Sequence, residues 1–256
     1  ETGTLYPEGR VQAIGELRRF ARIAADEEPE AFFLFATSAV RDASDGQAFV
    51  ADIKAAIGAE VEVISGLEEA RLAAEGVAGA IPGATGLVGD LGGGSLELVR
   101  LHNGRVLDQA TLPIGALRRT DASDMKETAI WIDQALTGVA WLPECSGQPF
   151  FLVGGAWRAF ARAHMLQQHY PLGVIHHYEM AAASAKGLAD IIAKMSKSSA
   201  ELLETISRRR RAIMPYAALV LARVIAQAAP SSVIASAHGL REGFIHDRCG
   251  IHGGDP

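Results

Sequence analysis

The stretch that decides the fold is residues 88–98, Val-Gly-Asp-Leu-Gly-Gly-Gly-Ser-Leu-Glu-Leu, in which three consecutive glycines separate two apolar segments. The apolar segments predict two strands, so Gly92, Gly93 and Gly94 are expected to form the tight turn between them. Because glycine has no Cβ, the backbone N–H groups of such a turn can converge on an anion. The stretch therefore predicts an anion-binding turn, with a plain hairpin turn as the alternative.

The residues around this turn exclude two familiar nucleotide-binding motifs and point to a metal. No Lys-Ser/Thr pair follows the glycines, as a Walker A motif requires, and a strand follows where a dinucleotide-binding fingerprint would open a helix. Asp90 and Glu97 flank the turn. Their carboxylates would repel an anionic ligand unless a hard cation such as Mg²⁺ lies between them. We therefore expect Asp90 and Glu97 beside a divalent cation.

Outward from this stretch, hydrophobic periodicity predicts α/β layers whose sheets are not purely parallel. Asn103-Gly104 predicts a hairpin between a strand over 96–101 and a strand over 106–112. A domain boundary is expected near residues 64–67. The other expected strands cover 31–35, 60–64, 87–91, 150–153 and 233–235. The expected helices cover 11–24, 49–57, 65–77, 124–140, 156–166, 178–193 and 208–229.

Two adjacent glutamates at a helix start have different predicted roles. Ser65-Gly66-Leu67-Glu68 fits a capping box, in which Glu68 reaches back to the backbone N–H of Ser65. Glu69 has no such structural role, and two adjacent residues of a helix cannot face the same way. On its own, Glu69 is more often a solvated first-turn acid that the helix dipole favours. Only its neighbours in the fold can make it a catalytic candidate.

Residues 36–41, Ala-Thr-Ser-Ala-Val-Arg, follow an expected buried strand, so their polar groups emerge at a strand end, where α/β folds place ligands. The guanidinium of Arg41 offers a fork of donors that suits an anion. A surface ion pair is the alternative for this residue. Arg41 is therefore a candidate anion ligand.

The composition is that of an ordinary globular protein: 256 residues, 49% hydrophobic and 21% charged, with a net charge of −6. The negative charge argues against DNA binding through a basic surface. No apolar run reaches the roughly 18 residues of a membrane span, and the first residues do not read as a signal peptide. Cys145 and Cys249 have no disulfide or zinc spacing, so a cytoplasmic protein is expected.

Several segments together resemble the exopolyphosphatase/guanosine pentaphosphate phosphohydrolase (Ppx/GppA) phosphatase family. The resemblance covers roughly residues 4–247, nearly the whole chain. Three central motifs occur in order, and three later segments are also similar. The segments are Ala-Thr-Ser-Ala-Val-Arg (36–41), Ile-Ser-Gly-Leu-Glu-Glu-Ala-Arg-Leu (64–72), Asp-Leu-Gly-Gly-Gly-Ser-Leu-Glu-Leu (90–98), Pro-Ile-Gly-Ala (113–116), Val-Gly-Gly (153–155) and Ser-Ala-His-Gly-Leu-Arg-Glu-Gly (236–243).

The resemblance implies an α/β, actin-like (ASKHA, ribonuclease H-like) two-lobed fold with mixed sheets. Residues 1–66 would form a partial N-terminal lobe, and residues 67–256 the second lobe with the glycine-rich phosphate loop. Members of the family begin with a strand and an Asp-x-Gly-Ser-type loop, which do not precede Glu1. The first lobe is therefore expected to be incomplete at its N-terminus.

The resemblance also implies a chemistry: a hydrolase that releases terminal phosphate from inorganic polyphosphate, guanosine pentaphosphate or both, with Mg²⁺ or another divalent cation. Glu69 matches the catalytic base that activates water. The matching phosphate ligands are Arg41, Gly92, Gly93, Gly94 and Ser95, and the matching acids near the metal are Asp90 and Glu97.

Two alternatives, one open question and one further feature complete the expectations. A catalytically weakened module that binds guanosine penta- or tetraphosphate or polyphosphate is the first alternative, supported by the absent first loop. A sugar or acetate kinase of the actin-like fold is the second, disfavoured by Glu69 and residues 36–41. A homodimer is left open. The run Arg208–Arg211 predicts a solvated helix face or, alternatively, a site that attracts polyphosphate.

Overall fold

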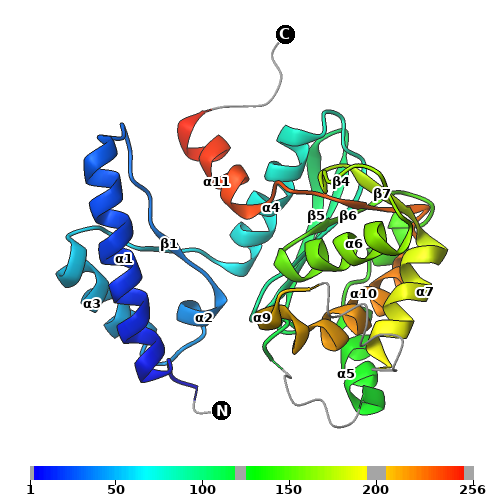
Figure 1. Cartoon of the computed structure of the whole chain (residues 1–256), viewed down its shortest axis with the longest axis horizontal. Helices are drawn as coiled ribbons and strands as arrows, with labels where there is room; N and C mark the ends of the chain where they lie inside the picture. The colour runs from blue at the N-terminus through cyan, green and yellow to red at the C-terminus, as the bar shows by residue number, and fades with distance from the viewer. Residues whose placement is uncertain (1–2, 119–124, 195–205, 251–256) are drawn as a thin grey trace. The chain divides into compact units, whose positions relative to one another are not determined.

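A computed structural model describes residues 3–118, 125–194 and 206–250 of the chain (Figure 1). The chain divides into two compact units, Glu1–Gly66 and Leu67–Pro256. The interpretation of these units as an incomplete and a complete actin-like lobe stays a prediction. Within the described ranges, no helix combines the length and the apolar character needed to cross a membrane.

The first unit pairs two very short strands with three helices. Strands β1 (Phe35–Ala36) and β2 (Glu62–Val63) are parallel neighbours. Arg10 of α1 (Pro7–Glu27) forms ion pairs with Asp45 and Asp52, which fix α1 against α3 (Gly46–Ile57). The remaining helix is α2 (Ser38–Arg41).

The predicted strand over 31–35 is wrong for its first residues. Phe32 and Phe33 are 43% and 45% exposed, and only residues 35 and 36 pair with β2. A strand needs a partner for its backbone groups, and β2 offers partners to two residues only. The apolar run therefore extends beyond the sheet.

The second unit contains a mixed six-stranded sheet in the order β5-β4-β3-β6-β8-β7. Strands β3, β6 and β8 are parallel, whereas β4, β5 and β7 run antiparallel to their neighbours. Asn103 and Gly104, both with positive φ, turn the chain between β4 and β5, which confirms the predicted hairpin. The bounds are β3 Gly86–Leu91, β4 Leu96–His102, β5 Arg105–Leu112, β6 Phe150–Val153, β7 Tyr178–Ala181 and β8 Ser232–Ala235.

Helices cover both faces of this sheet, as Figure 1 shows. Helix α4 (Gly66–Ala80) packs on one face through Ala70, Ala74 and Val77, which meet Val88 and Val99 of the sheet. The larger core lies on the other face, because alternate strand residues point there. That face carries α5 (Met125–Thr137), α6 (Gly155–Gln167), α7 (Ala182–Ala193) and α10 (Met214–Ala228).

Two predicted helices begin differently in the structure. Residues 178–181 form strand β7 and not the start of a helix, because they pair antiparallel with β8. The predicted helix over 208–229 is two helices, α9 (Arg208–Arg211) and α10. Pro215 lies in the first turn of α10, where the missing N–H of proline costs no helical hydrogen bond. Residue 124, the predicted start of another helix, lies outside the described residues.

Helix α11 (Leu240–Cys249) crosses α4 at unusually short range. A Cβ atom on Gly243 would lie 1.8 Å from the carbonyl oxygen of Leu72, and one on Gly76 would lie 2.1 Å from that of Gly239. Arg71 of α4 also forms an ion pair with Asp247 of α11. These contacts hold the first turns of α4 in a fixed register relative to the end of the second unit.

Candidate active site

The glycine-rich turn joins β3 to β4, and its three glycine carbonyl oxygens accept hydrogen bonds from residues 116–118. The carbonyl oxygens of Gly92 and Gly93 accept hydrogen bonds from the backbone N–H groups of Ala116 and Leu117, at 2.9 and 2.8 Å. The carbonyl oxygen of Gly94 accepts one from Nε of Arg118 at 2.7 Å. These bonds hold the acceptors of the turn toward residues 116–118, where they cannot repel an anion that approaches the amides.

Two backbone N–H groups of the turn, in contrast to its carbonyl oxygens, are not engaged in hydrogen bonds with described residues. Among the residues that the structure describes, the N–H groups of Gly93 and Gly94 have no hydrogen-bond acceptor. Gly93 is exposed, and Gly94 is partly exposed. Exposed, unpaired backbone N–H groups beside one another form an anion-binding concavity. These two amides are accessible to an anion, and the role of the turn as a phosphate-binding loop stays a prediction.

A residue outside the triple-glycine run must also be glycine for this turn to form as it does. None of the three glycines of the turn has a positive φ. A Cβ atom on Gly115, in contrast, would lie 2.3 Å from the carbonyl carbon of Gly94 and from the backbone nitrogen of Ser95. Real Cβ atoms do not approach backbone so closely, so Gly115 is what allows residues 115–118 to lie against the turn.

Asp90 and Glu97 lie opposite one another on β3 and β4, on the sheet face that α4 covers. They are cross-strand partners, and each is two residues from a valine that packs under α4, Val88 and Val99 respectively. Because strand residues alternate between faces, both carboxylates point to the α4 side. Two carboxylates directly opposite on a sheet repel each other, so this pair is costly unless a cation or a proton compensates.

A third acid joins them from the first turn of α4. Glu69 is only 6% exposed, and its negative charge raises the pKa values of both Asp90 and Glu97. Glu68, the adjacent residue, instead forms an ion pair with Arg71 at 2.6 Å. The two glutamates therefore have different surroundings, and the capping role of Glu68 stays a prediction.

Burial is the main cause of the perturbed acidity of these carboxyls. Loss of hydration, followed by the charge of Glu69, raises the pKa of Asp90 to about 7, although Arg158 lowers it in part. The same two causes raise the pKa of Glu97 to about 8, opposed by the hydroxyl groups of Ser95 and Thr111. Raised carboxyl pKa values of this kind occur at buried sites where acids lie close together, and they often mark functional sites.

The donors at this site fit a magnesium ion that a phosphate ligand helps to bind. Oε1 of Glu97 accepts a hydrogen bond from Thr111 at 3.0 Å, whereas its buried Oε2 has no partner among the described residues. In the described ranges, no three acids, histidines or cysteines are close enough together to hold a metal ion by themselves. Mg²⁺ usually takes only one or two carboxylates and completes its octahedron with waters and substrate phosphates. Asp90 and Glu97 would supply these two carboxylates.

A second glycine position fits closely against Asp90. Gly154, between β6 and α6, has φ of 94°, and a Cβ atom there would lie 2.8 Å from Oδ1 of Asp90. This contact places the N-terminus of α6, with its partial positive charge, beside the buried acids. The side chain of Arg158, in the first turns of α6, donates a hydrogen bond to the carbonyl oxygen of Ala237 at 2.8 Å.

The structure brings together the predicted site residues that belong to the second unit. Glu69, Asp90, Glu97, Ser95 and the turn 92–94 meet in the second unit, where Ser95 is buried. Arg41 belongs to the first unit, where it donates to the carbonyl oxygen of Ile64 and contacts Asp42. Its role as a phosphate ligand, like the roles of the other residues, stays a prediction.

Sequence reasoning did not assign roles to four residues of this region. Gly115 and Arg118 support the turn, and Gly154 and Arg158 lie beside or near Asp90. Gly115 and Gly154 lie in segments that carry the family resemblance, which was the available signal. Nothing in the local sequence of Arg118 or Arg158 distinguishes them from surface arginines.

Comparisons with known proteins find relatives and solved structures that are similar to this chain. Exopolyphosphatase 1 of Mycobacterium leprae is 28% identical over 249 residues, which cover 92% of this chain and 72% of the relative. Exopolyphosphatase 2 of Mycobacterium tuberculosis is 35% identical over 127 residues, or 47% of this chain and 40% of the relative. The crystal structure of an exopolyphosphatase-like protein matches with a TM-score of 0.85 and 26% identity, covering 96% of this chain and 84% of that one.

The fold prediction is confirmed by such structures. A Ppx/GppA family member from Aquifex aeolicus superposes with a TM-score of 0.78 at 23% identity, covering all of this chain and 86% of the other. These neighbours have the actin-like α/β fold with mixed sheets. The model of the Ppx/GppA phosphatase family matches residues 1–252, and the chain therefore belongs to the Ppx/GppA phosphatase family.

Proposed function

We propose that the protein hydrolyses the terminal phosphoanhydride bond of inorganic polyphosphate or of guanosine pentaphosphate, in a reaction that depends on a divalent cation such as Mg²⁺. Membership of the family and similarity to proteins named exopolyphosphatase support this class of reaction. The observation that carries the proposal is the convergence of three acids, Glu69, Asp90 and Glu97, beside a turn with unpaired amides. Acids beside an anion-binding turn are costly unless the ligand is brought there with a cation.

Each part of the site has a distinct role in this proposal. The N–H groups of Gly93 and Gly94 hold the terminal phosphate, whose charge increases on the oxygens that they contact. Asp90 and Glu97 would hold Mg²⁺, which when bound neutralises phosphate charge and polarises the phosphoanhydride. Glu69 orients the attacking water and accepts its proton. The water oxygen forms a bond to the terminal phosphorus, while the bridging oxygen leaves with the shortened chain.

The buried position of Glu69 suits this role. Its carboxylate lies near Asp90 and Glu97, whose pKa values its charge raises, and so stands beside the two acids that would hold the metal. Glu68 lacks this environment because Arg71 neutralises it and lowers its pKa. The pair therefore gives a matched comparison of two adjacent glutamates in one helix.

Substitution of the two glutamates tests the proposal. Phosphate release from polyphosphate and from guanosine pentaphosphate is measured at saturating substrate with Mg²⁺ and with excess EDTA. We expect Glu69→Gln to lower turnover by about 10²–10⁴-fold, the usual contribution of a general base, and EDTA to abolish turnover. Glu68→Gln is the control and should remain within a few-fold of the unsubstituted protein.

Two results would contradict the proposal. Full activity in EDTA would exclude the metal-dependent mechanism, and a larger loss in Glu68→Gln than in Glu69→Gln would reverse the assigned roles. Tight binding of either substrate without any turnover would favour the alternative, a module that binds these phosphates without hydrolysing them.

We also propose a cytoplasmic location. Cys145 and Cys249 are both free thiols, with Cys145 buried and Cys249 exposed. Unpaired cysteines are typical of a reducing compartment.

A further inference from the structure

The position of Glu69 depends on how helix α4 lies on the sheet. Asp90 and Glu97 belong to β3 and β4, whereas Glu69 belongs to the first turn of α4. Because the three acids lie on separate elements, they stay together only while that turn keeps its place. In enzymes a misplacement of about 1 Å can cost about 100-fold in rate. The contacts that hold α4 therefore bear directly on the proposed reaction.

Helix α11 contacts α4 on both sides of the point where the two helices cross. At the crossing, the backbone of Gly243 packs directly against that of α4. On the C-terminal side, the ring of His246 lies beside Gly79, where a Cβ atom would be 2.4 Å from Cε1 of the ring. On the N-terminal side, Asp247 forms an ion pair with Arg71, which is about 12 Å from Gly79 along the axis of α4. Contacts on both sides fix the crossing angle, which a single point of contact would leave free.

Arg71 is the residue through which α11 acts on the first turn of α4. Its guanidinium donates to both carboxylate oxygens of Glu68, at 3.0 and 2.6 Å, and to a carboxylate oxygen of Glu75. These two partners belong to α4 itself. Within the described ranges, Asp247 is the carboxylate that binds Arg71 from another element, with Oδ1 3.0 Å from Nη2. Because Glu68 directly precedes Glu69, the ion pairs of Arg71 connect α11 to the turn that carries the proposed base.

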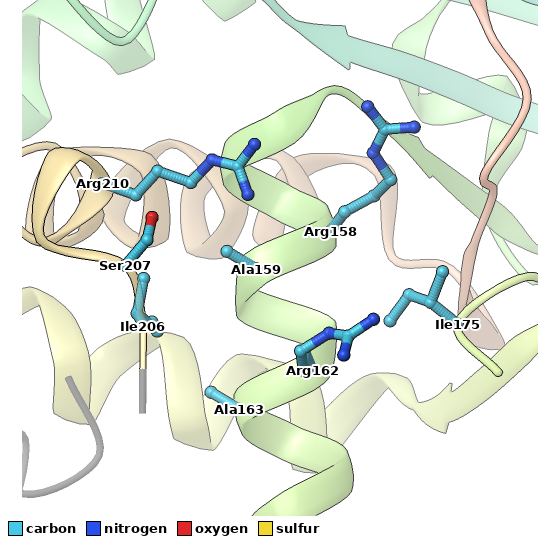
Figure 2. Close-up of a pocket in the computed structure, with 8 residues that line it drawn as sticks. All are labelled: Arg158, Ala159, Arg162, Ala163, Ile175, Ile206, Ser207 and Arg210. Atoms are coloured by element: carbon cyan, nitrogen blue, oxygen red, sulfur yellow. The ribbon is translucent and has the colours of Figure 1, made fainter. Parts of the chain in front are cut away.

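Helix α11 is itself anchored to the sheet and to α6, so it gives α4 a fixed reference. Its N-cap residue, Gly239, lies so close to β6 that a Cβ atom there would be 2.2 Å from Cγ1 of Val153. The segment before α11 is held by Arg158, whose side chain donates to the carbonyl oxygen of Ala237. Figure 2 shows Arg158 extending from α6, where it lines a pocket of about 340 Å³. The ion pair between α11 and α4 therefore ties the first turn of α4 to the sheet that carries the other two acids.

We propose that Asp247 is a positioning residue of the candidate active site: its ion pair with Arg71 holds the first turn of α4 so that Glu69 stays beside the two acids of the sheet. The inference rests on the proposed function, because it assumes that Glu69 is the base. Asp247 acts through Arg71 and the helix, so its loss should slow the chemical step and leave substrate binding unchanged.

The kinetics of Asp247→Asn test this inference, with Asp133→Asn as a matched control. Asp133 of α5 pairs with Arg223 of α10, so its substitution breaks an Asp–Arg pair between two helices of the same unit at similar exposure. Phosphate release from long-chain polyphosphate with Mg²⁺ gives kcat and KM. We expect Asp247→Asn to lower kcat about tenfold, part of the ~100-fold that a full ångström can cost, with KM unchanged within about twofold. Asp133→Asn should change neither constant more than about twofold. Asp247→Glu keeps the charge and should restore most of kcat.

A second set of variants separates the positioning of Glu69 from a general loss of structure. In the Glu69→Gln background the base is absent, so Asp247→Asn should lower kcat no further than about twofold. A further loss of about tenfold in this double variant would show that Asp247 acts through another group, and the inference would be wrong. It would also be wrong if Asp247→Asn and Asp133→Asn had the same kcat, or if Asp247→Asn raised KM at an unchanged kcat.

Hydrogen exchange separates this inference from the proposed function, because it needs no turnover. In a helix, the N–H groups of residues 70–73 bond to the carbonyl oxygens of residues 66–69, so their exchange reports on the first turn of α4. Suppose that no variant releases phosphate but these amides exchange about threefold faster in Asp247→Asn than in Asp133→Asn. The ion pair then holds the turn as inferred, and the proposed reaction fails. Equal exchange in the two variants would refute the inference whatever the turnover.

Discussion

Substitution of Glu97 by glutamine should stabilise the metal-free protein while removing a proposed metal ligand. Glu97 is 1% exposed, and its pKa is raised from 4.5 to about 8 by burial and by the charge of Glu69. Glutamine has nearly the same shape, and its side-chain oxygen can still accept the hydrogen bond that Thr111 donates to Oε1. The substitution therefore removes the charge and leaves the packing in place.

The sign and the size of the effect follow from proton linkage. In the unfolded chain Glu97 ionises near its ordinary pKa of 4.5, whereas in the folded protein it keeps its proton up to about pH 8. The folded state thus binds more protons between these values, so the free energy of unfolding decreases as pH rises. With about 1.36 kcal/mol for each pKa unit, the loss between pH 5 and pH 8 is roughly 3 kcal/mol. Glutamine does not titrate and should show no such loss.

The difference in stability between Glu97→Gln and the unsubstituted protein can be measured by thermal unfolding in EDTA between pH 5 and pH 8, with circular dichroism as the signal. The advantage of Glu97→Gln over the unsubstituted protein should grow with pH by roughly 3 kcal/mol, or on the order of 5–10 °C in Tm. Glu68→Gln is the control of opposite sign: Arg71 lowers the pKa of Glu68, so neutralising it should destabilise slightly at every pH in this range. A Glu97→Gln protein less stable than the original at pH 8, or a pH-independent difference, would refute the argument.

Two glycine substitutions test the packing in opposite directions. Gly115→Ala should push residues 115–118 away from the turn, lower the free energy of unfolding by about 1–3 kcal/mol and impair phosphate release, because its Cβ would lie 2.3 Å from backbone atoms. Denaturant unfolding and the activity assay check this, and normal values in both would contradict it. Gly187→Ala, within α7, has open space around its new Cβ and should raise stability by about 0.5–1 kcal/mol in the same unfolding assay, without an effect on turnover. A loss of stability would show that α7 is constrained in a way that these contacts do not reveal.

Local sequence signals predicted the parts of the fold that depend on neighbouring residues. Asn103-Gly104 defines the β4–β5 hairpin through its own backbone preferences, and the triple glycine defines the turn between β3 and β4. Strand β7 was missed because its buried–exposed alternation lasts only four residues and runs directly into α7. What makes these residues a strand is pairing with β8, which is distant in the sequence. Such pairing has no local signal.

The same distinction applies to the candidate site. Asp90, Glu97 and the turn are contiguous in the sequence, so their proximity could be predicted from a strand-turn-strand reading. Glu69 needed the family resemblance, because a first-turn glutamate is unremarkable until α4 places it beside two other acids. The support from Gly115 and Arg118 could not be predicted, since it depends on how a later segment folds back against the turn.

The position of β8 in the sheet also affects how the chain folds while it is being synthesised. Strand β8 lies between β6 and β7, although it follows both in the sequence, and β7 has no other partner in the described sheet. Until residues 232–235 leave the ribosome, β6 and β7 therefore each expose a strand edge whose N–H and C=O groups are unpaired. Exposed edges of this kind associate with other chains, so incomplete translation products should aggregate or depend on chaperones. The sheet that carries the acids is therefore completed only when β8, which follows its other five strands in the sequence, has been synthesised.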